Sequence, residues 1–90
     1  MPLQSAYIRD EDRLDITFDG NLDFSLSGDI FRICKHPPRN LRSCILDLSG
    51  VSRVFDSGVA LLQLLSRQLS QSGAMVVLLT DHPDITTRVS

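Results

Sequence analysis

Two short apolar segments on either side of an amphipathic one most constrain how this chain can fold. Residues 44–48 and 74–79 are almost continuously apolar, and their length favours strands over helices. Between them, residues 57–71 carry leucines at helical spacing and end before Gly73, a helix stop. A strand, a helix and a strand with short connections form a parallel pair with a right-handed crossover. We therefore predict two buried strands in an α/β sheet, the first of them central and covered on both faces.

The residues before this unit are predicted to form an antiparallel hairpin. Residues 6–9 and 14–18 indicate strands, since apolar and polar side chains alternate in the second of them. The acidic residues 10–12 supply the turn between the strands, and the Asp-Gly step at 19–20 closes the hairpin. The hairpin is expected at one side of a mixed sheet.

Two further helices complete the predicted order of elements. Ser25 or Ser27 caps a short helix that ends near residue 36, where two consecutive prolines prevent its continuation. A final helix begins after Thr80 or Asp81, with Pro83 in its first turn. The 90 residues thus predict one α/β domain, in the order β-β-α-β-α-β-α, with helices packed against the mixed sheet.

Composition and charge argue against several classes of function. A formal net charge of -2, with nine scattered Lys and Arg residues, argues against direct nucleic-acid binding. The sequence shows neither an apolar run of about 18 residues nor a signal-peptide segment. We therefore expect no direct membrane insertion and a cytoplasmic protein. The glycines are isolated, so a phosphate-binding loop is not predicted.

Nucleophilic and metal-ligating residues give no sign of a catalytic or metal centre. Cys34 and Cys44 lack a CxxC partner and are predicted to be buried free thiols. His36 and His82 lack the spacing of metal ligands. Ser57 has no glycine two residues before it, as a nucleophile elbow requires. We expect no metal, no cofactor and no catalytic residue, and hence a protein that is not an enzyme.

The step Asp56-Ser57-Gly58, at the start of the long apolar helix, allows two interpretations. In the first, Asp56 and Ser57 cap free helix amides and Gly58 gives the turn its freedom. In the second, the step belongs to a surface that docks a partner. Three nearby apolar side chains are predicted to project away from the leucine face of the helix: Val59, Ala60 and Leu64. Neighbouring loops could equally cover these side chains, so both interpretations stay open.

At this point the sequence resembles the STAS domain and, among STAS proteins, the small anti-sigma-factor antagonists. Gly20-Asn21-Leu22-Asp23 is similar to the family's Gly-Glu-Leu-Asp. Residues 45–51, the Asp-Ser-Gly step with its apolar helix, and residues 73–77 continue the resemblance in order and at fitting intervals. It covers the chain from Ala6 onwards and implies the STAS fold.

The resemblance implies a non-enzymatic partner-switching regulator of transcription. In the family pattern Asp-Ser-Ser/Thr-Gly, a cognate anti-sigma kinase phosphorylates the serine after the aspartate, and Ser57 matches that serine. Asp56 matches the aspartate before it, and Asp23 matches a family position on the partner surface. The second Ser/Thr is absent here, so Gly58 follows one residue early. Aligned on the glycine instead, Ser57 takes the place of the second hydroxyl residue.

A second class of function is also compatible with the resemblance. Some small STAS proteins are constitutive cytoplasmic subunits of membrane lipid-transport ATPase complexes, a role that needs no phosphorylated serine. The partner is a protein in both cases: an anti-sigma factor or serine kinase in the first, a transporter ATPase in the second. From the resemblance we expect the family's C-terminal elements to be shortened or absent, and the short sheet edge that this would leave favours association, for example as a homodimer.

Overall fold

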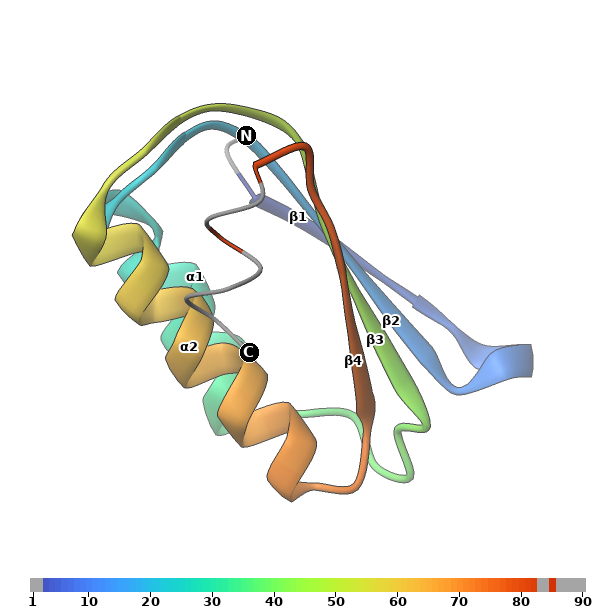
Figure 1. The fold of residues 1–90 in the computed structure, drawn as a ribbon. Coiled ribbons are helices and arrows are strands. Elements are labelled where there is room, and N and C mark those ends of the chain that lie inside the picture. Colours follow the sequence, from blue (N-terminus) through green and yellow to red (C-terminus); the bar gives the residue numbers. More distant parts are fainter. Residues whose placement is uncertain (1–2, 83–84, 86–90) are drawn as a thin grey trace.

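The computed structural model describes residues 3–82 and 85, which form a four-stranded mixed sheet with two helices on one side (Figure 1). The strand order is β1-β2-β3-β4, with β1 antiparallel to β2 and the other neighbours parallel. The elements, in chain order, are β1 (Leu3–Ile8), η1 (Arg9–Glu11), β2 (Arg13–Leu22), η2 (Phe24–Leu26), α1 (Ser27–Lys35), β3 (Ser43–Val54), α2 (Asp56–Gln71) and β4 (Met75–Leu79). The predicted mixed α/β sheet with its hairpin at one side is confirmed. The predicted final helix falls outside the described residues, except for the buried Ile85.

The core lies between the sheet and the two helices. Every second side chain of the central strands faces the helices and is buried, as a period of two requires. These side chains are Leu14, Ile16 and Phe18 of β2 with Cys44, Leu46 and Leu48 of β3. The predicted leucine face of α2 packs against them and is buried too: Leu61, Leu62, Leu65 and Leu69. Helical periodicity in the sequence therefore identified the core face of α2 correctly.

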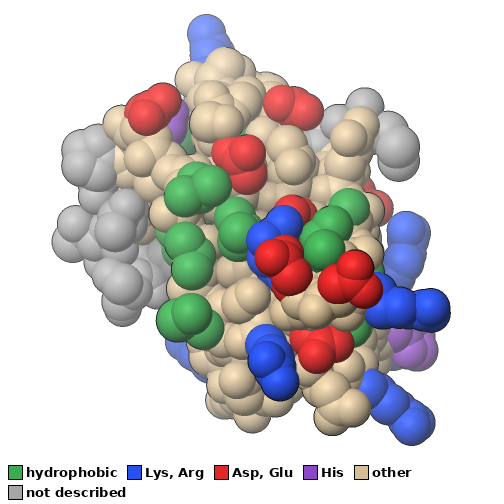
Figure 2. Space-filling model, turned by 90° about the vertical axis from the view of Figure 1, so that its right-hand side faces the viewer, with side chains coloured by type: hydrophobic (Ala, Val, Ile, Leu, Met, Phe, Trp, Pro, Cys, Tyr) green, Lys and Arg blue, Asp and Glu red, His purple; other side chains and the backbone are tan. Residues whose placement is uncertain are grey.

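The opposite face of the sheet is open among the described residues, which corrects two predictions. β3 is covered on one face only, and β4 is not a buried strand: Met75 is 66% exposed and Leu79 47%. Both crossovers move in the same direction across the sheet, from β2 to β3 and from β3 to β4. Equal handedness then places α1 and α2 on the same face. Figure 2 shows hydrophobic side chains gathered on the open face beside a group of charged ones.

The strands are longer than the sequence pattern suggested. The hairpin turn lies at η1, which overlaps the predicted acidic segment, but Asp19 and Gly20 lie inside β2 rather than at its end. β3 likewise continues to Val54, through residues predicted to form a loop. The pairing of β2 with β3 shifts register on both sides of this region, where Gly20 has a φ of 79°. Irregular pairing interrupts the alternation of apolar and polar side chains, so strict alternation in the sequence does not indicate the full length of these strands.

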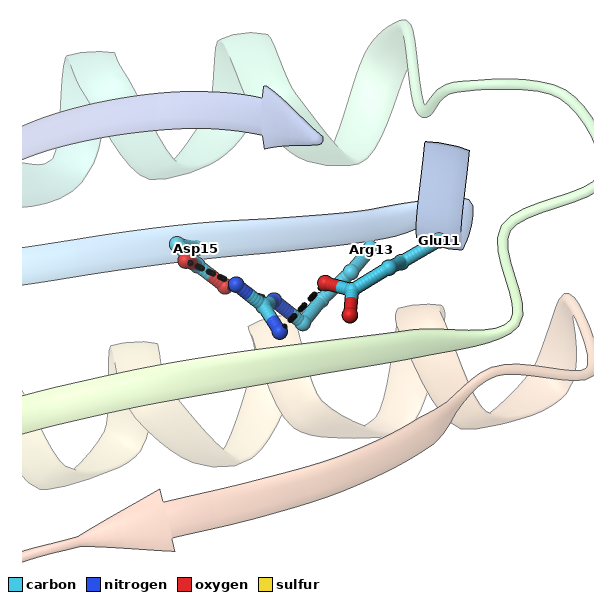
Figure 3. Close-up of polar contacts among 3 residues, drawn as sticks. All are labelled: Glu11, Arg13 and Asp15. Carbon is cyan, nitrogen blue, oxygen red and sulfur yellow. Dashed lines mark hydrogen bonds and ion pairs between the residues drawn. The ribbon is translucent and has the colours of Figure 1, made fainter. Parts of the chain in front are cut away.

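Arg13 lies between two carboxylates on the open face of β2 (Figure 3). Its Nε donates to Asp15 Oδ1 at 2.8 Å and its Nη2 to Asp15 Oδ2 at 3.2 Å, while Nη1 lies 2.6 Å from Glu11 Oε2. Asp15 is paired with Ile45 of β3, so this ionic group borders the apolar part of the open face. Part-exposed ion pairs of this kind contribute at most about 1 kcal/mol each.

The two cysteines are free thiols in different environments. Cys44 is fully buried, as predicted, whereas Cys34 is only partly buried. Burial raises the pKa of Cys44 to about 12, with a smaller contribution from the charge of Asp15, and burial also raises the pKa of Cys34. Because the thiolate is the reactive form, both thiols are poor nucleophiles.

We expect this difference in burial to appear in alkylation kinetics. Iodoacetamide at pH 8 should modify Cys34 slowly and leave Cys44 unmodified in the native protein, because Cys44 has neither access nor thiolate character. Intact mass spectrometry over time measures the alkylation of the two thiols, and unfolding in urea should make their alkylation rates equal. Equal rates at both thiols in the native protein would contradict this burial pattern.

Candidate functional site

The ends of β2 and β3 bring together two segments that are distant in sequence. The strands are parallel, and Leu22 pairs with Val54 at their carboxyl ends. The chain therefore leaves both strands at the same edge of the sheet, through Asp23 on one side and Phe55 on the other. The Phe55 N–H donates to the Leu22 carbonyl at 2.9 Å and ties the two exits together. Asp23 and the Asp-Ser-Gly step, both identified in the sequence, thus meet at one site.

Gly58 is the closest point of packing between these segments. A Cβ at Gly58 would lie 2.1 Å from the Leu22 carbonyl oxygen and 2.3 Å from its carbonyl carbon. The positive-φ glycines are Gly20 and Gly73, so Gly58 is not needed for turn freedom, which corrects the sequence interpretation. It is needed because the start of α2 rests directly on the backbone of β2.

Neither Asp56 nor Ser57 occupies the N-cap position of α2, which differs from the predicted capping role. Phe55 is the N-cap residue, and the first helical bond runs from the Val59 N–H to the Phe55 carbonyl at 3.1 Å. Asp56 and Ser57 are therefore the first and second residues of the helix. Ser57 is half-buried, and within the described chain its hydroxyl has no hydrogen-bond partner. Its hydroxyl is not engaged in capping the helix.

Asp23 takes the capping role that the sequence had assigned to Ser25 or Ser27. Its carboxylate accepts from the Ser25 N–H at 2.9 Å and from the Ser25 hydroxyl, and so caps η2. α1 follows η2 directly, without a side-chain cap of its own. These bonds, the hydroxyl's first, lower the pKa of Asp23 below its ordinary value of 3.8. Asp23 therefore remains ionised at a lower pH than an aspartate with the ordinary pKa.

A titration tests this arrangement. A lowered folded-state pKa means that Asp23 contributes stability above its unfolded pKa, and that this contribution is lost as pH falls through the folded pKa. Replacing Ser25 with alanine should raise the pKa of Asp23 towards 3.8, measured by NMR of the carboxyl carbons. Asp47, which accepts the same two kinds of bond from Ser49, is the internal control and should keep its lowered pKa. An unchanged Asp23 pKa in Ser25→Ala would contradict the assignment.

The predicted apolar patch on α2 is only partly exposed. Ala60 is exposed and Leu64 is half-buried, on the same side of the helix as Ser57 because they follow it by three and seven residues. Val59 is 2% exposed, so it is covered and does not belong to an exposed patch, which corrects its selection as a partner-binding residue. α2 contacts η2 and β2, and Gly58 in its first turn lies directly against the Leu22 backbone.

Two exposed aromatic residues, missed in the sequence, flank the site. Phe24 is 69% exposed and lies two residues after the end of β2, and Phe55 is 43% exposed and directly follows the end of β3. The available signal was their position: each aromatic lies next to an acidic residue at an element boundary, outside any amphipathic pattern. We call the combined area the docking surface, and its residues are Asp23, Phe24, Phe55, Asp56, Ser57, Ala60 and Leu64.

The docking surface combines aromatic and apolar side chains with two acidic residues around a serine hydroxyl. Aromatic residues are enriched at protein interfaces, where they bury large areas at a low entropic cost. Within the described part of the chain, no three His, Cys, Asp or Glu side chains come together as metal ligands do. No described helix is long and apolar enough to span a membrane. The arrangement is suited to binding a protein surface with apolar and basic groups.

Comparison with solved structures identifies the fold. No model of a protein family matches the sequence, and no curated protein matches it. An antisigma-factor antagonist STAS domain from Rhodobacter sphaeroides is 17% identical, with 98% of this chain and 89% of that one covered and a TM-score of 0.67. The anti-sigma factor antagonist SpoIIAA in its unphosphorylated form is 19% identical, with 94% and 78% covered and a TM-score of 0.69. The chain has the STAS fold.

The same fold occurs within longer chains. The murine anion transporter Slc26a9, solved in its inward-facing state, is 28% identical, with 88% of this chain covered and a TM-score of 0.65. This chain spans 13% of that transporter, and it spans 18% of another matching structure. The fold alone therefore does not distinguish a free-standing regulator from a component of a transport system.

Proposed function

We propose that this chain is a non-enzymatic partner-switching regulator that binds an anti-sigma factor or a similar serine kinase through the docking surface. Phosphorylation of Ser57 would control the binding. The two antagonist structures, which share the fold over nearly the whole of this chain, support this class of function. SpoIIAA is described as an anti-sigma factor antagonist in an unphosphorylated form, which is the state proposed here for binding.

The position of Ser57 carries the proposal. It lies in the first turn of α2, part-exposed, between the acidic Asp56 and the apolar side chains of Ala60 and Leu64. A serine that merely capped the helix would use its hydroxyl for that bond, and within the described chain it does not. This position supports the proposal, in which a kinase would modify the hydroxyl and the modification would change the surface that a partner contacts.

The charge of a phosphate explains how one group can switch binding while preserving the fold. Phosphorylation adds about 1.5 to 2 negative charges to a surface that already carries Asp23 and Asp56. The free amides and dipole at the start of α2 favour such a charge, so the domain itself tolerates it. A partner that fits closely around Phe24 and Phe55 would instead have to bury that charge, which is costly.

The alternative is a constitutive subunit of a membrane lipid-transport ATPase complex. The shortened Asp-Ser-Gly motif favours it, because Gly58 is fixed by its packing on Leu22 and the second hydroxyl residue of the family pattern is missing. The STAS fold within an anion transporter adds a precedent for association with transport. In this alternative the same docking surface binds the ATPase and Ser57 stays unmodified.

Recovery of the tagged protein from its own cells tests both functions. Mass spectrometry identifies the proteins that bind to the wild-type chain but not to a matched variant, Phe24→Asp, whose exposed side chain lies on the docking surface. We expect an anti-sigma factor or serine kinase, and a fraction of the chain with phosphate on Ser57. An ATPase and a permease, with Ser57 unmodified, would contradict the switch and establish the alternative.

A further inference from the structure

We propose that β4 is a dimerisation strand, and that a second copy of this chain pairs with it in the antiparallel direction about a two-fold axis at Val77. β4 is an edge of the sheet, and no other described strand pairs with its outer side. Edge strands are normally protected by charged residues, proline or bulges. β4 has none of these, since its five residues are Met, Val, Val, Leu and Leu.

The hydrogen-bonding pattern of β4 determines the register. The Met75 N–H donates to the Arg42 carbonyl at 2.9 Å, so the backbone polar groups of Met75 point towards β3. Because these groups alternate along a strand, those of Val76 and Leu78 point to the outer edge. If Val76 of each copy pairs with Leu78 of the other, all of these outward-pointing N–H and C=O groups form hydrogen bonds between the two copies. Val77 then faces Val77 of the second copy as a non-hydrogen-bonded pair.

This register is also self-complementary in its side chains. On the open face, Val77 meets its own copy at the axis and Met75 meets Leu79 on either side. Their exposed fractions of 36%, 66% and 47% show that apolar area remains to be buried there. Side chains directly opposite each other in an antiparallel pair interact, and they lie closest at non-hydrogen-bonded positions. An isologous interface requires such self-matching, and this strand provides it at every position.

Charges at the two ends of β4 favour the antiparallel direction. Arg42 lies beside the start of β4, and its side chain is 82% exposed, with a long 3.8 Å contact to Asp12. Asp81 is exposed and follows the end of β4 by two residues. Antiparallel pairing brings Asp81 of each copy towards the Arg42 end of the other, whereas parallel pairing would place like charges together.

The dimer leaves the docking surface free. That surface is built at the ends of β2 and β3 and on the first turns of α2, whereas β4 pairs through its outer edge. A dimer would therefore present two docking surfaces to its partners. The proposal stands independently of the function of Ser57.

Disulfide trapping tests the register. In a chain with Cys34 replaced by alanine, Val77→Cys should form a disulfide-linked dimer under mild oxidation, because the opposed Cβ atoms at the axis lie about 4.5 to 5.5 Å apart. Met75→Cys and Leu79→Cys should cross-link to each other when mixed, and neither should cross-link to itself. Self-cross-linking of Met75→Cys or Leu79→Cys in place of Val77→Cys would overturn the proposed axis.

Sedimentation equilibrium between about 1 and 100 µM tests the association itself and covers the affinities of small interfaces. We expect Val77→Asp, which opposes two like charges at the axis, to weaken the dimer by about 100-fold. Gln4→Asp adds the same charge on the exposed opposite edge strand and should leave the dimer unchanged. A wild-type chain that stays monomeric over this range would overturn the proposal, and would assign this strand to another protein or to a further segment of chain. Equal weakening by both variants would overturn it too.

Discussion

Replacing Gly58 with alanine is expected to lower the free energy of unfolding by about 3 kcal/mol, and the melting temperature by roughly 12 to 24 °C. The new methyl group would lie 2.1 Å from the Leu22 carbonyl oxygen. Backbone cannot rotate aside as a flexible side chain can, so the helix start must move away from β2. Thermal unfolding followed by circular dichroism measures the change.

Gly28 provides a matched control for this substitution. It also lies in the first turn of a helix, but nothing lies within 4 Å of a Cβ built there. Gly28→Ala should therefore stabilise the protein by about 0.5 kcal/mol through helix propensity alone. Similar melting temperatures for the two variants would show that α2 does not rest on the Leu22 backbone as described.

Replacing Ser57 with aspartate is expected to weaken binding of the captured partner by at least about 100-fold, because a like charge is added to an acidic docking surface. The same substitution should stabilise the fold slightly, by about 0.3 to 1 kcal/mol, because Ser57 lies in the first turn of α2. Isothermal titration calorimetry with the purified partner measures the first effect and thermal unfolding the second. Loss of binding with retained stability is the signature of a surface switch.

Ser57→Ala is the matched control, since it removes the hydroxyl without adding charge. It should bind within about threefold of the wild type, because truncation at one position on an interface is usually near-neutral outside its central aromatic residues. Equal binding by Ser57→Asp and Ser57→Ala would contradict the electrostatic mechanism. Weak binding by both would instead show that the hydroxyl itself is recognised.

The fold was largely predictable because its signals are local. Helical spacing identified the core face of α2, and the short apolar runs identified β3 and β4. The side of the sheet on which a helix lies depends on the direction of both crossovers, which no short segment encodes. For that reason β4 was predicted to be buried, whereas Met75 and Leu79 are exposed on the open face.

The placement of the candidate residues was predictable in outline, but several details of their packing were not. The sequence and its family resemblance identified Asp23 and the Asp-Ser-Gly step, and parallel pairing of β2 with β3 brings these segments together. The role of Gly58 depends on a backbone 36 positions earlier in the chain, at Leu22, and so could not be inferred locally. The exposure of Phe24 and the burial of Val59 likewise depend on the tertiary arrangement and have no local sequence signal.

The phosphate content of Ser57 in bound and unbound protein tests the central claim most directly. The chain is recovered from its own cells, separated into partner-bound and free pools, and the phosphorylated fraction at Ser57 is measured in each by mass spectrometry. The account predicts phosphate in the free pool and little or none in the bound pool, because the modified docking surface cannot be buried against the partner. Equal phosphorylation in the two pools, or phosphate concentrated in the bound pool, would contradict it.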